Sequence, residues 1–283
     1  MSSTPTPNNY HQESIASWCA NASYWDDGIG HDGNKYWKCL QEPVLRRLIQ
    51  IRTTNPEDQQ RVLEFATGNG LVARWLVDNI PNSFSVLATD VSQEMLDLAK
   101  RREEESPSRH EGRRIEYRRV DVTDEEALAA LPSGYEIVVM NMALMDVSTI
   151  EPLASALPKL LNKGGIFVAT LLHPIFFTSG ATRNIQLIDS SNGVHIVRGK
   201  LIDRYLDVPP YRGVALPGQP AQQVYFHRPL HELFAPFFSA GLVMDALEEP
   251  GWAAEDADPD RIESHTNFTQ LPAILGFRMR RII

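Results

Sequence analysis

The chain has 283 residues, of which 43% are hydrophobic, and its formal net charge at pH 7 is −9. This length and apolar content suffice for one large α/β domain. The acidic charge argues against nucleic acid or an anionic membrane as the main partner, because both favour clustered Lys and Arg. Cys19 and Cys39 form no metal-binding pattern, and "MSSTPTPNNYHQ" has no apolar signal core. We therefore expect a cytoplasmic protein without a membrane span or a metal.

Two helical patterns precede the first predicted strand. They cover residues 11–26 and 35–52 and are joined by the turn-rich loop "DDGIGHDGN". We expect residues 1–8 to be disordered and residues 53–60 to form a connector. Residues 1–60 are thus predicted to form a helical cap.

From Arg61 onward, strands and helices alternate. The apolar runs predict strands over 62–65, 84–89, 115–120, 137–140 and 166–172. Helices are predicted over 71–80, after the N-cap Ser92, after a capping box of Thr123 and Glu126, and over 149–161, where Gly164 and Gly165 follow and Pro158 should cause a kink. Continuous apolar strands separated by helices predict a parallel sheet covered on both faces.

A long insert follows the fifth strand. Residues 174–223 contain a predicted hairpin with its turn at Asn192 and Gly193, and the aromatic content of the insert predicts a packed lid over the substrate. A helix from Pro229 to Gly241, a strand to Leu247 and a C-terminal strand complete the pattern. We therefore predict one domain, with its core formed by residues 61–173 and 224–283.

The first glycine turn, in "VLEFATGNGLVARWL", decides which ligand the core binds. Read from Gly68, the letters G-N-G-L-V-A fit the dinucleotide fingerprint. A pyrophosphate would then lie on the N-terminus of the following helix, where the Glu64 carboxylate would repel it. The same carboxylate favours a cation, and S-adenosylmethionine carries an ammonium and a sulfonium but no phosphate.

Two further acids end the next two strands. Asp90 can accept hydrogen bonds from ribose hydroxyls, which suits either kind of nucleotide. Asp121 can accept one from an adenine amine, with Met95 and Val122 as apolar walls for the ring. Each acid alone has the alternative role of a helix cap or turn residue, but three at successive strand ends predict a nucleoside site.

The motifs "VLEFATGNG", "LATDVSQEML", "RVDVTD", "IVVMNMALMDV" and "LLNKGGIFVATLLHP" resemble the class I S-adenosylmethionine-dependent methyltransferases over about residues 61–173. The resemblance implies a Rossmann-like sheet of seven strands with the last one antiparallel. Ala66 departs from the family's glycine. The implied cofactor-binding residues are Glu64, Ala66, Gly68, Gly70, Asp90, Val91, Met95, Asp121, Val122 and Asn141.

Methyl transfer requires the nucleophile, the methyl group and the leaving sulfur in line, and it requires a base only when the nucleophile is protonated. His173, after the fifth strand, is the candidate base; its alternative role is a packed or capping histidine. His227 and His231 are separated by Pro229 and lack a third metal ligand. The candidate acceptor contacts are Trp25, Tyr36, Met142, Phe176, Phe177 and Tyr211.

The expected acceptor is a neutral, partly apolar small molecule. The leader and tail of the chain are similar to fungal secondary-metabolite methyltransferases, including those that methylate thiols of reduced epidithiodiketopiperazines. That resemblance implies a thiol acceptor, with an oxygen or nitrogen acceptor as the alternative. A nicotinamide or flavin oxidoreductase and a non-catalytic cofactor-binding regulator are the alternatives from other classes. Either a monomer or a homodimer is expected.

Overall fold

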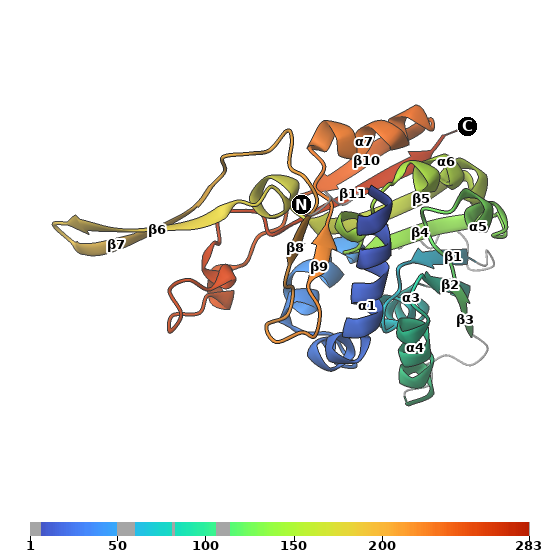
Figure 1. The fold of residues 1–283 in the computed structure, drawn as a ribbon, viewed down its shortest axis with the longest axis horizontal. Coiled ribbons are helices and arrows are strands. Elements are labelled where there is room, and N and C mark those ends of the chain that lie inside the picture. Colours follow the sequence, from blue (N-terminus) through green and yellow to red (C-terminus); the bar gives the residue numbers. More distant parts are fainter. Residues whose placement is uncertain (1–6, 50–59, 81–82, 106–113, 283) are drawn as a thin grey trace, which may run out of the picture.

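A computed structural model describes residues 7–49, 60–80, 83–105 and 114–282. Its main sheet has seven strands in the order β10-β11-β5-β4-β1-β2-β3 (Figure 1). Their bounds are β1 Gln60–Phe65, β2 Ser83–Asp90, β3 Arg114–Arg119, β4 Tyr135–Asn141, β5 Leu161–Leu172, β10 Leu242–Glu248 and β11 Ile274–Arg281. Strands β1 to β5 are parallel, whereas β11 runs antiparallel to both of its neighbours. The predicted Rossmann-like α/β sheet is confirmed.

Both faces of the sheet are buried, as the continuous apolar runs predicted. Along β4, Val138 and Met140 pack in one core with α6 (Glu151–Leu160) and α7 (Leu230–Ser239). Ile137 and Val139 pack on the opposite face with α2 (Glu42–Ile49) and α3 (Leu71–Asn79). Alternate residues of a strand point to opposite faces of the sheet. A strand whose central residues are all apolar is therefore covered on both faces. Helix α4 (Gln93–Glu105) packs against β2 and β3, and α5 (Glu125–Ala129) packs against α6.

The N-terminal residues cover the carboxyl ends of the parallel strands. Helix α1 spans Pro7–Ile29 and packs against α4 and against β9 (Gln223–Tyr225), a strand at the end of the insert (Figure 1). The second helical pattern begins as a π-helix, η1 (Trp37–Gln41), and continues as α2. The helical cap is thus present, while the predicted connector and residues 1–6 lie outside the described residues.

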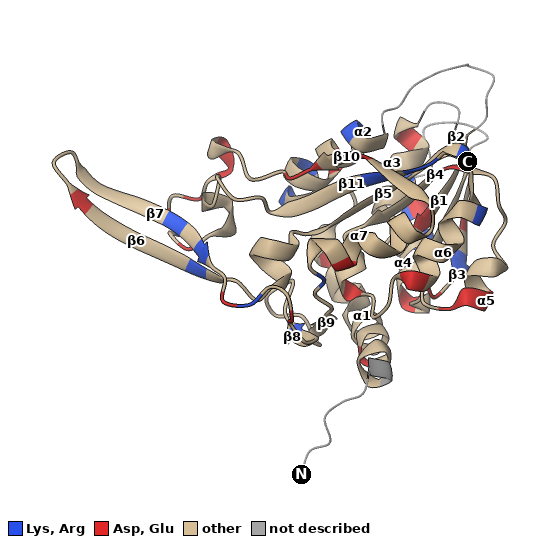
Figure 2. Cartoon of the chain, turned by 90° about the horizontal axis from the view of Figure 1, so that it is seen from above, with Lys and Arg blue, Asp and Glu red and all other residues tan. Residues whose placement is uncertain are grey.

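The predicted hairpin forms, but it is not a packed lid. Strands β6 (Thr182–Ser190) and β7 (Gly193–Leu201) make a two-stranded sheet that extends away from the body of the molecule (Figures 1 and 2). Its apolar side chains are exposed, with Leu187 at 66%. Only its base is anchored, by hydrogen bonds from Arg183 to Glu263 and from Arg198 to Ile262. The lid prediction is therefore wrong for the hairpin, whereas other residues of the same insert, among them Phe177, Leu216 and Gln223, line the cavity described below.

The remainder of the insert returns to the body. The π-helix η3 (Pro174–Thr178) follows β5, and β8 (Tyr211–Gly213) pairs with β9 beside α1. Three short 3-10 helices complete the elements: η2 (Leu144–Asp146), η4 (Ala254–Asp256) and η5 (His265–Asn267).

Three local predictions need correction. Asp124, not Thr123, caps α5, because its carboxylate accepts hydrogen bonds from the backbone of Glu126 and Ala127. Gly164 and Gly165 lie inside β5 and do not end a helix. Pro158 lies in the last turn of α6, and the helix ends two residues later at Leu160.

Two arginines near the end of α4 form ion pairs with α1. The Arg102 guanidinium donates to both carboxylate oxygens of the buried Asp26, at 3.0 and 2.9 Å. Arg101 lies 3.8 Å from the same carboxylate. These ion pairs join α4 to α1 and fix the position of the helix above the strand ends.

Candidate active site

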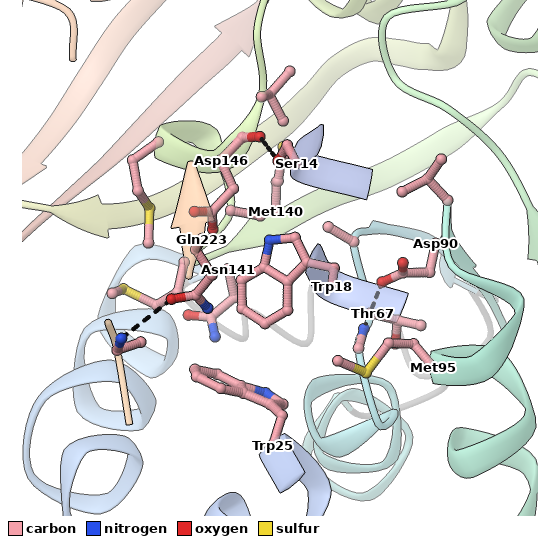
Figure 3. Close-up of a pocket in the computed structure, with 18 of the residues that line it drawn as sticks. Ser14, Trp18, Trp25, Thr67, Asp90, Met95, Met140, Asn141, Asp146 and Gln223 are labelled. Atoms are coloured by element: carbon pink, nitrogen blue, oxygen red, sulfur yellow. Dashed lines mark hydrogen bonds between the residues drawn. The ribbon is translucent and has the colours of Figure 1, made fainter. Parts of the chain in front are cut away.

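A cavity of about 440 Å³ lies at the carboxyl ends of β1, β2 and β4, beneath α1. Figure 3 shows the Trp18 ring of α1 between two groups of polar residues, Thr67 and Asp90 on one side and Asn141, Asp146 and Gln223 on the other. Ligands of open parallel sheets bind at this edge, where the carboxyl ends of the strands meet. The cavity therefore has one end near Asp90 and a second end near Asp146.

The glycine turn after β1 forms part of the cavity wall. Gly68 has φ +57°, and a Cβ built there meets no atom within 4 Å, so a ligand can approach its backbone. Gly70, with φ +75°, does not line the cavity; its Cβ would lie 2.9 Å from Ala99 Cβ in α4. Ala66 lines the cavity with φ +54°, in the left-handed region that glycine adopts more easily.

Glu64 lies in the wall below this turn and is 1% exposed. Its Oε2 accepts a hydrogen bond of 2.7 Å from the Thr67 hydroxyl. Burial raises the pKa of Glu64 to about 8, against the lowering effects of Thr67 and Arg74. A buried acid with a raised pKa and no ion pair among the described residues can gain a cation from a ligand.

Asp90 ends β2 on the same side of the cavity and is 8% exposed. Its two oxygens accept backbone hydrogen bonds of 2.9 Å, one from Gly68 and one from Ser92. Burial raises the pKa of Asp90 in spite of these bonds. The carboxylate is thus held in a fixed orientation next to the glycine turn, while Val91 and Met95 continue the wall.

Asp121 lines the cavity next to Val122, but it already has a partner that the sequence did not indicate. His11 of α1 lies 3.0 Å from Asp121 Oδ2 through Nε2 and 3.2 Å from the Ser148 hydroxyl through Nδ1. Thr123 donates to the other oxygen of Asp121 from its backbone and its hydroxyl. The separation of 110 residues between His11 and Asp121 explains why no sequence spacing could reveal this contact.

The lining of the cavity is acidic. Four carboxyl groups line it, those of Glu64, Asp90, Asp121 and Asp146, together with His11 and His265, whereas no Lys or Arg does so in the described part of the chain. Such a wall favours a cationic ligand and disfavours phosphate groups.

Aromatic and amide side chains form the second end of the cavity. The Trp18 and Trp25 rings meet edge to face with their centroids 5.1 Å apart, and Tyr36 and Phe177 also line this region.

 Asn141 Nδ2 donates to Gln41 of η1 at 2.9 Å, and Asn141 Oδ1 accepts from the Thr170 hydroxyl at 2.6 Å. Asn141 is therefore held by two side chains at the end of β4.

Asp146, in η2, is a cavity residue that the sequence analysis missed. Its Oδ1 is shielded from solvent and has no hydrogen-bond partner in the described part of the chain, and the Tyr36 hydroxyl is in the same state. Burial raises the pKa of Asp146 well above its usual range. The only sequence signal was its place a few residues after the fourth predicted strand, which many loop acids share.

His173 does not fit the role of base. It does not line the cavity, its side chain is 0% exposed, and both ring nitrogens are engaged. Nε2 lies 2.8 Å from Glu249, and Nδ1 accepts from the backbone of Ile175 at 3.3 Å. The alternative role, a packed histidine that caps η3, describes this geometry.

The other predicted acceptor contacts divide into two groups. Trp25, Tyr36, Met142 and Phe177 line the cavity, whereas Phe176 and Tyr211 do not. Phe176 packs on the His173 ring and Tyr211 packs on the Tyr225 ring. Met142 has φ +53°, an uncommon conformation for a residue with a side chain, and its backbone N–H donates to Thr170.

Neither a metal centre nor a membrane span is found in the described residues. They contain no group of three His, Cys, Asp or Glu residues placed to hold a metal ion. His227 contacts Thr178 and Tyr205, while His231 is exposed next to Glu232. No described helix combines the length and the apolar character that crossing a membrane requires.

Comparisons with known proteins agree with this geometry. Residues 62–165 match the model of the methyltransferase domain. A release factor glutamine methyltransferase from Bacteroides thetaiotaomicron is 28% identical over 102 residues, which are 36% of this chain and 34% of that protein. The chain thus spans only about a third of the length of the curated relatives it matches.

Two solved structures are similar over most of the chain. An S-adenosylmethionine-dependent methyltransferase from Mesorhizobium loti has a TM-score of 0.61 and 22% identity, covering 89% of this chain and 100% of that one. The amino pentose methyltransferase CalS10 from Micromonospora echinaspora, with S-adenosylmethionine bound, has a TM-score of 0.51 and 15% identity, covering 92% and 95%. Residues 62–165 thus match a methyltransferase domain, and the chain shares its fold with S-adenosylmethionine-dependent methyltransferases of known structure.

Proposed function

We propose that the protein is an S-adenosylmethionine-dependent methyltransferase that acts on a heteroatom of a small molecule. The observation that carries the proposal is the charge of the cavity, with four carboxylates and no Lys or Arg among its described lining residues. A cavity of this charge suits a ligand with an ammonium and a sulfonium. It does not suit the pyrophosphate of a nicotinamide or flavin dinucleotide, which disfavours the oxidoreductase alternative.

In this proposal, different residues of the chain bind different parts of the cofactor. Glu64 pairs with the ammonium, directly or through water, next to the open backbone of Gly68. Asp90 accepts from the ribose hydroxyls, and Asp121 takes part in the adenine end of the site with its partner His11. When bound, S-adenosylmethionine supplies a methyl group on a positively charged sulfur. The residues around it orient the acceptor and exclude water.

For the acceptor, we propose a small molecule that is not anionic. The lining of the second end is aromatic and acidic, so an anion there would be both desolvated and repelled. The resemblance of the leader and tail favours a thiol of a fungal secondary metabolite, with a hydroxyl or an amine as the alternative. Incubation with labelled S-adenosylmethionine and a panel of thiols, phenols and amines distinguishes these acceptors.

Glu64→Ala tests the cofactor site directly. We expect the affinity for S-adenosylhomocysteine, measured by calorimetry at pH 8, to fall by tenfold or more, on the order of 1.5–3 kcal/mol for a lost charge-assisted hydrogen bond. Glu116→Ala, in which an exposed acid on β3 is removed, is the matched control and should bind as the wild type does. Unchanged affinity of Glu64→Ala, or binding of NAD instead of S-adenosylhomocysteine by the wild type, would contradict the proposal.

A further inference from the structure

Asp146 is a partly buried acid whose Oδ1 is shielded from solvent and has no partner in the described part of the chain. It ends η2. Buried polar groups are almost always paired, and an unpaired one costs free energy. A carboxylate that contributes nothing to the fold but lines a ligand cavity calls for a role in that cavity.

The backbone around Asp146 is held firmly, although its carboxylate is not. Arg228 donates to the carbonyl oxygens of Leu144 and Val147, at 3.2 and 2.8 Å. The Ser14 hydroxyl donates to the Asp146 carbonyl oxygen at 2.8 Å. Arg228, which lies between β9 and α7, therefore bonds the backbone of this loop and forms no ion pair with the Asp146 carboxylate. This arrangement fixes the position of the acid while keeping it available.

The titratable groups near Asp146 come from three other segments. The acid raises the pKa of Tyr211, in β8, and of Tyr225, in β9, in addition to the effect of their burial. Tyr36, which precedes η1, has a buried hydroxyl without a partner and lines the same cavity. Burial also lowers the pKa of Arg228 to about 10, so Arg228 stays protonated at neutral pH. None of these groups forms a hydrogen bond or an ion pair with the Asp146 carboxylate in the described residues.

Figure 3 places Asp146 beside Gln223 and Asn141, on the side of Trp18 away from Asp90. Gln223 Oε1 accepts from the Ala215 backbone at 3.2 Å and from the Tyr225 hydroxyl at 3.3 Å. Its amide group is thereby oriented next to the acid. If the nucleoside occupies the Asp90 side, the acceptor must enter the Asp146 side.

We propose that Asp146 is the catalytic proton acceptor of the reaction, and that the methyl acceptor is consequently a proton-bearing nucleophile, a thiol, a hydroxyl or an amine. The proposal rests on the proposed function. It assigns to Asp146 the role that the sequence analysis gave to His173. It disfavours acceptors that carry no proton on the reacting atom, such as tertiary amines.

The proposed step balances in atoms and charge. The proton on the nucleophilic atom moves to an Asp146 carboxylate oxygen, and the electron pair left on that atom forms the new bond to the methyl carbon. The bond from that carbon to sulfur breaks, and its electron pair stays on sulfur. An acid whose burial raises its pKa holds an accepted proton more firmly than an exposed carboxylate does, which suits a proton acceptor.

Asp146→Asn tests the assignment, since the amide keeps the shape of the carboxylate but cannot accept the proton as a base. The probes are phenylmethanethiol, phenol and benzylamine, each with labelled S-adenosylmethionine, and pyridine, which is neutral at pH 7 and has no proton on its nitrogen. For the proton-bearing probes that the wild type methylates, we expect kcat/KM to fall by about 10²-fold or more. We expect a much smaller loss for pyridine, which has no proton to give up. Asp189→Asn, at an exposed position of β6, is the matched control and should act as the wild type does.

A second readout does not depend on turnover. A free buried acid with a raised pKa contributes stability at low pH that is lost as pH rises through its folded pKa. The melting temperature of the wild type should therefore fall relative to that of Asp146→Asn as the pH rises above the range in which an ordinary aspartate titrates. Glu64 and Asp90 titrate in both proteins, so their effects cancel in the difference.

The outcomes separate this proposal from the proposed function. Calorimetry with S-adenosylhomocysteine reports the cofactor site, and Asp146→Asn should bind it within about twofold of the wild type. A wild type that binds no S-adenosylhomocysteine overturns the proposed function. An unchanged pH–rate profile in Asp146→Asn, parallel melting curves, or a wild type that binds the cofactor product but methylates none of the proton-bearing probes overturns the role of Asp146.

Discussion

At the scale of single residues, side chains of the same type have different roles because their surroundings differ. Glu64 and Asp146 are both buried acids of the cavity wall, but Glu64 accepts a hydrogen bond from Thr67, whereas Asp146 Oδ1 has no described partner. The two glycines of the first turn differ in the same way. Gly68 borders the cavity, whereas Gly70 lies against Ala99 of α4.

The two glycines make a matched pair of variants. Gly70→Ala should lower the free energy of unfolding by about 2–4 kcal/mol, because a left-handed φ is strained for alanine and the new Cβ overlaps with Ala99. Gly68→Ala should cost only the strain, about 1–2 kcal/mol. It should weaken S-adenosylhomocysteine binding because its Cβ would face the cavity. Urea unfolding and calorimetry measure the two effects; equal effects of both variants on stability and on binding would contradict this division.

At the scale of elements, α1 and the hairpin illustrate opposite outcomes for segments outside the sheet. Helix α1 supplies His11, Ser14 and Trp18 to the cavity and is tied to α4 through Asp26 and Arg102. The hairpin β6–β7 forms its own two-stranded sheet, and its tip is far from the strand ends (Figures 1 and 2). We therefore expect α1 to contribute to ligand binding and the hairpin β6–β7 not to contribute.

The hairpin can be shortened to test this expectation. Asn184 and Gly199 face each other across the pair, so residues 185–198 can be replaced by a two-residue Asn-Gly turn. The shortened protein should keep its S-adenosylhomocysteine affinity within about twofold and lose less than about 1 kcal/mol of stability, because an isolated hairpin is marginal by itself. A tenfold loss of affinity in calorimetry would show that the hairpin does act as a lid.

At the scale of the whole molecule, the fold gathers acids from separate strands at one edge of the sheet. Burial raises the pKa of Glu64 to about 8, and it also raises the pKa of Asp90 and of Asp146. Each of these acids favours its neutral form in the folded protein more than in the unfolded chain. The stability of the free protein is thus linked to pH through the cavity.

The direction of this pH dependence predicts how pH changes the stabilisation of the protein by a bound ligand. Because the folded pKa values are raised, the contribution of these acids to stability is complete below about pH 4 and is lost as pH rises toward 8. A bound cation reverses the loss at Glu64 by stabilising its carboxylate. The increase in melting temperature caused by S-adenosylhomocysteine should therefore grow between pH 5 and pH 8. In Glu64→Gln this growth should be reduced, and an increase that is independent of pH in the wild type would contradict the linkage.

The sequence by itself determined the sheet and the Asp90 end of the cavity. Apolar runs of strand length between helical patterns specify parallel strands that are buried on both faces. Glu64, Asp90 and Asp121 follow from the same pattern, because the carboxyl ends of parallel strands meet at one edge and acids at those ends are brought together. Local periodicity and strand order are enough to bring these three acids together, since they come from neighbouring strands.

Only the tertiary structure decided the second end of the cavity, and the physical reason is the sequence distance of its contacts. His11 reaches Asp121 across 110 residues, and Asn21 bonds Ala221 across 200. His173 is packed against Glu249, whereas Asp146 Oδ1 is left without a described partner, so only Asp146 is available to a ligand in the cavity. Burial and pairing of this kind are properties of the assembled core, so residue type and spacing could not distinguish a packed histidine from a free acid.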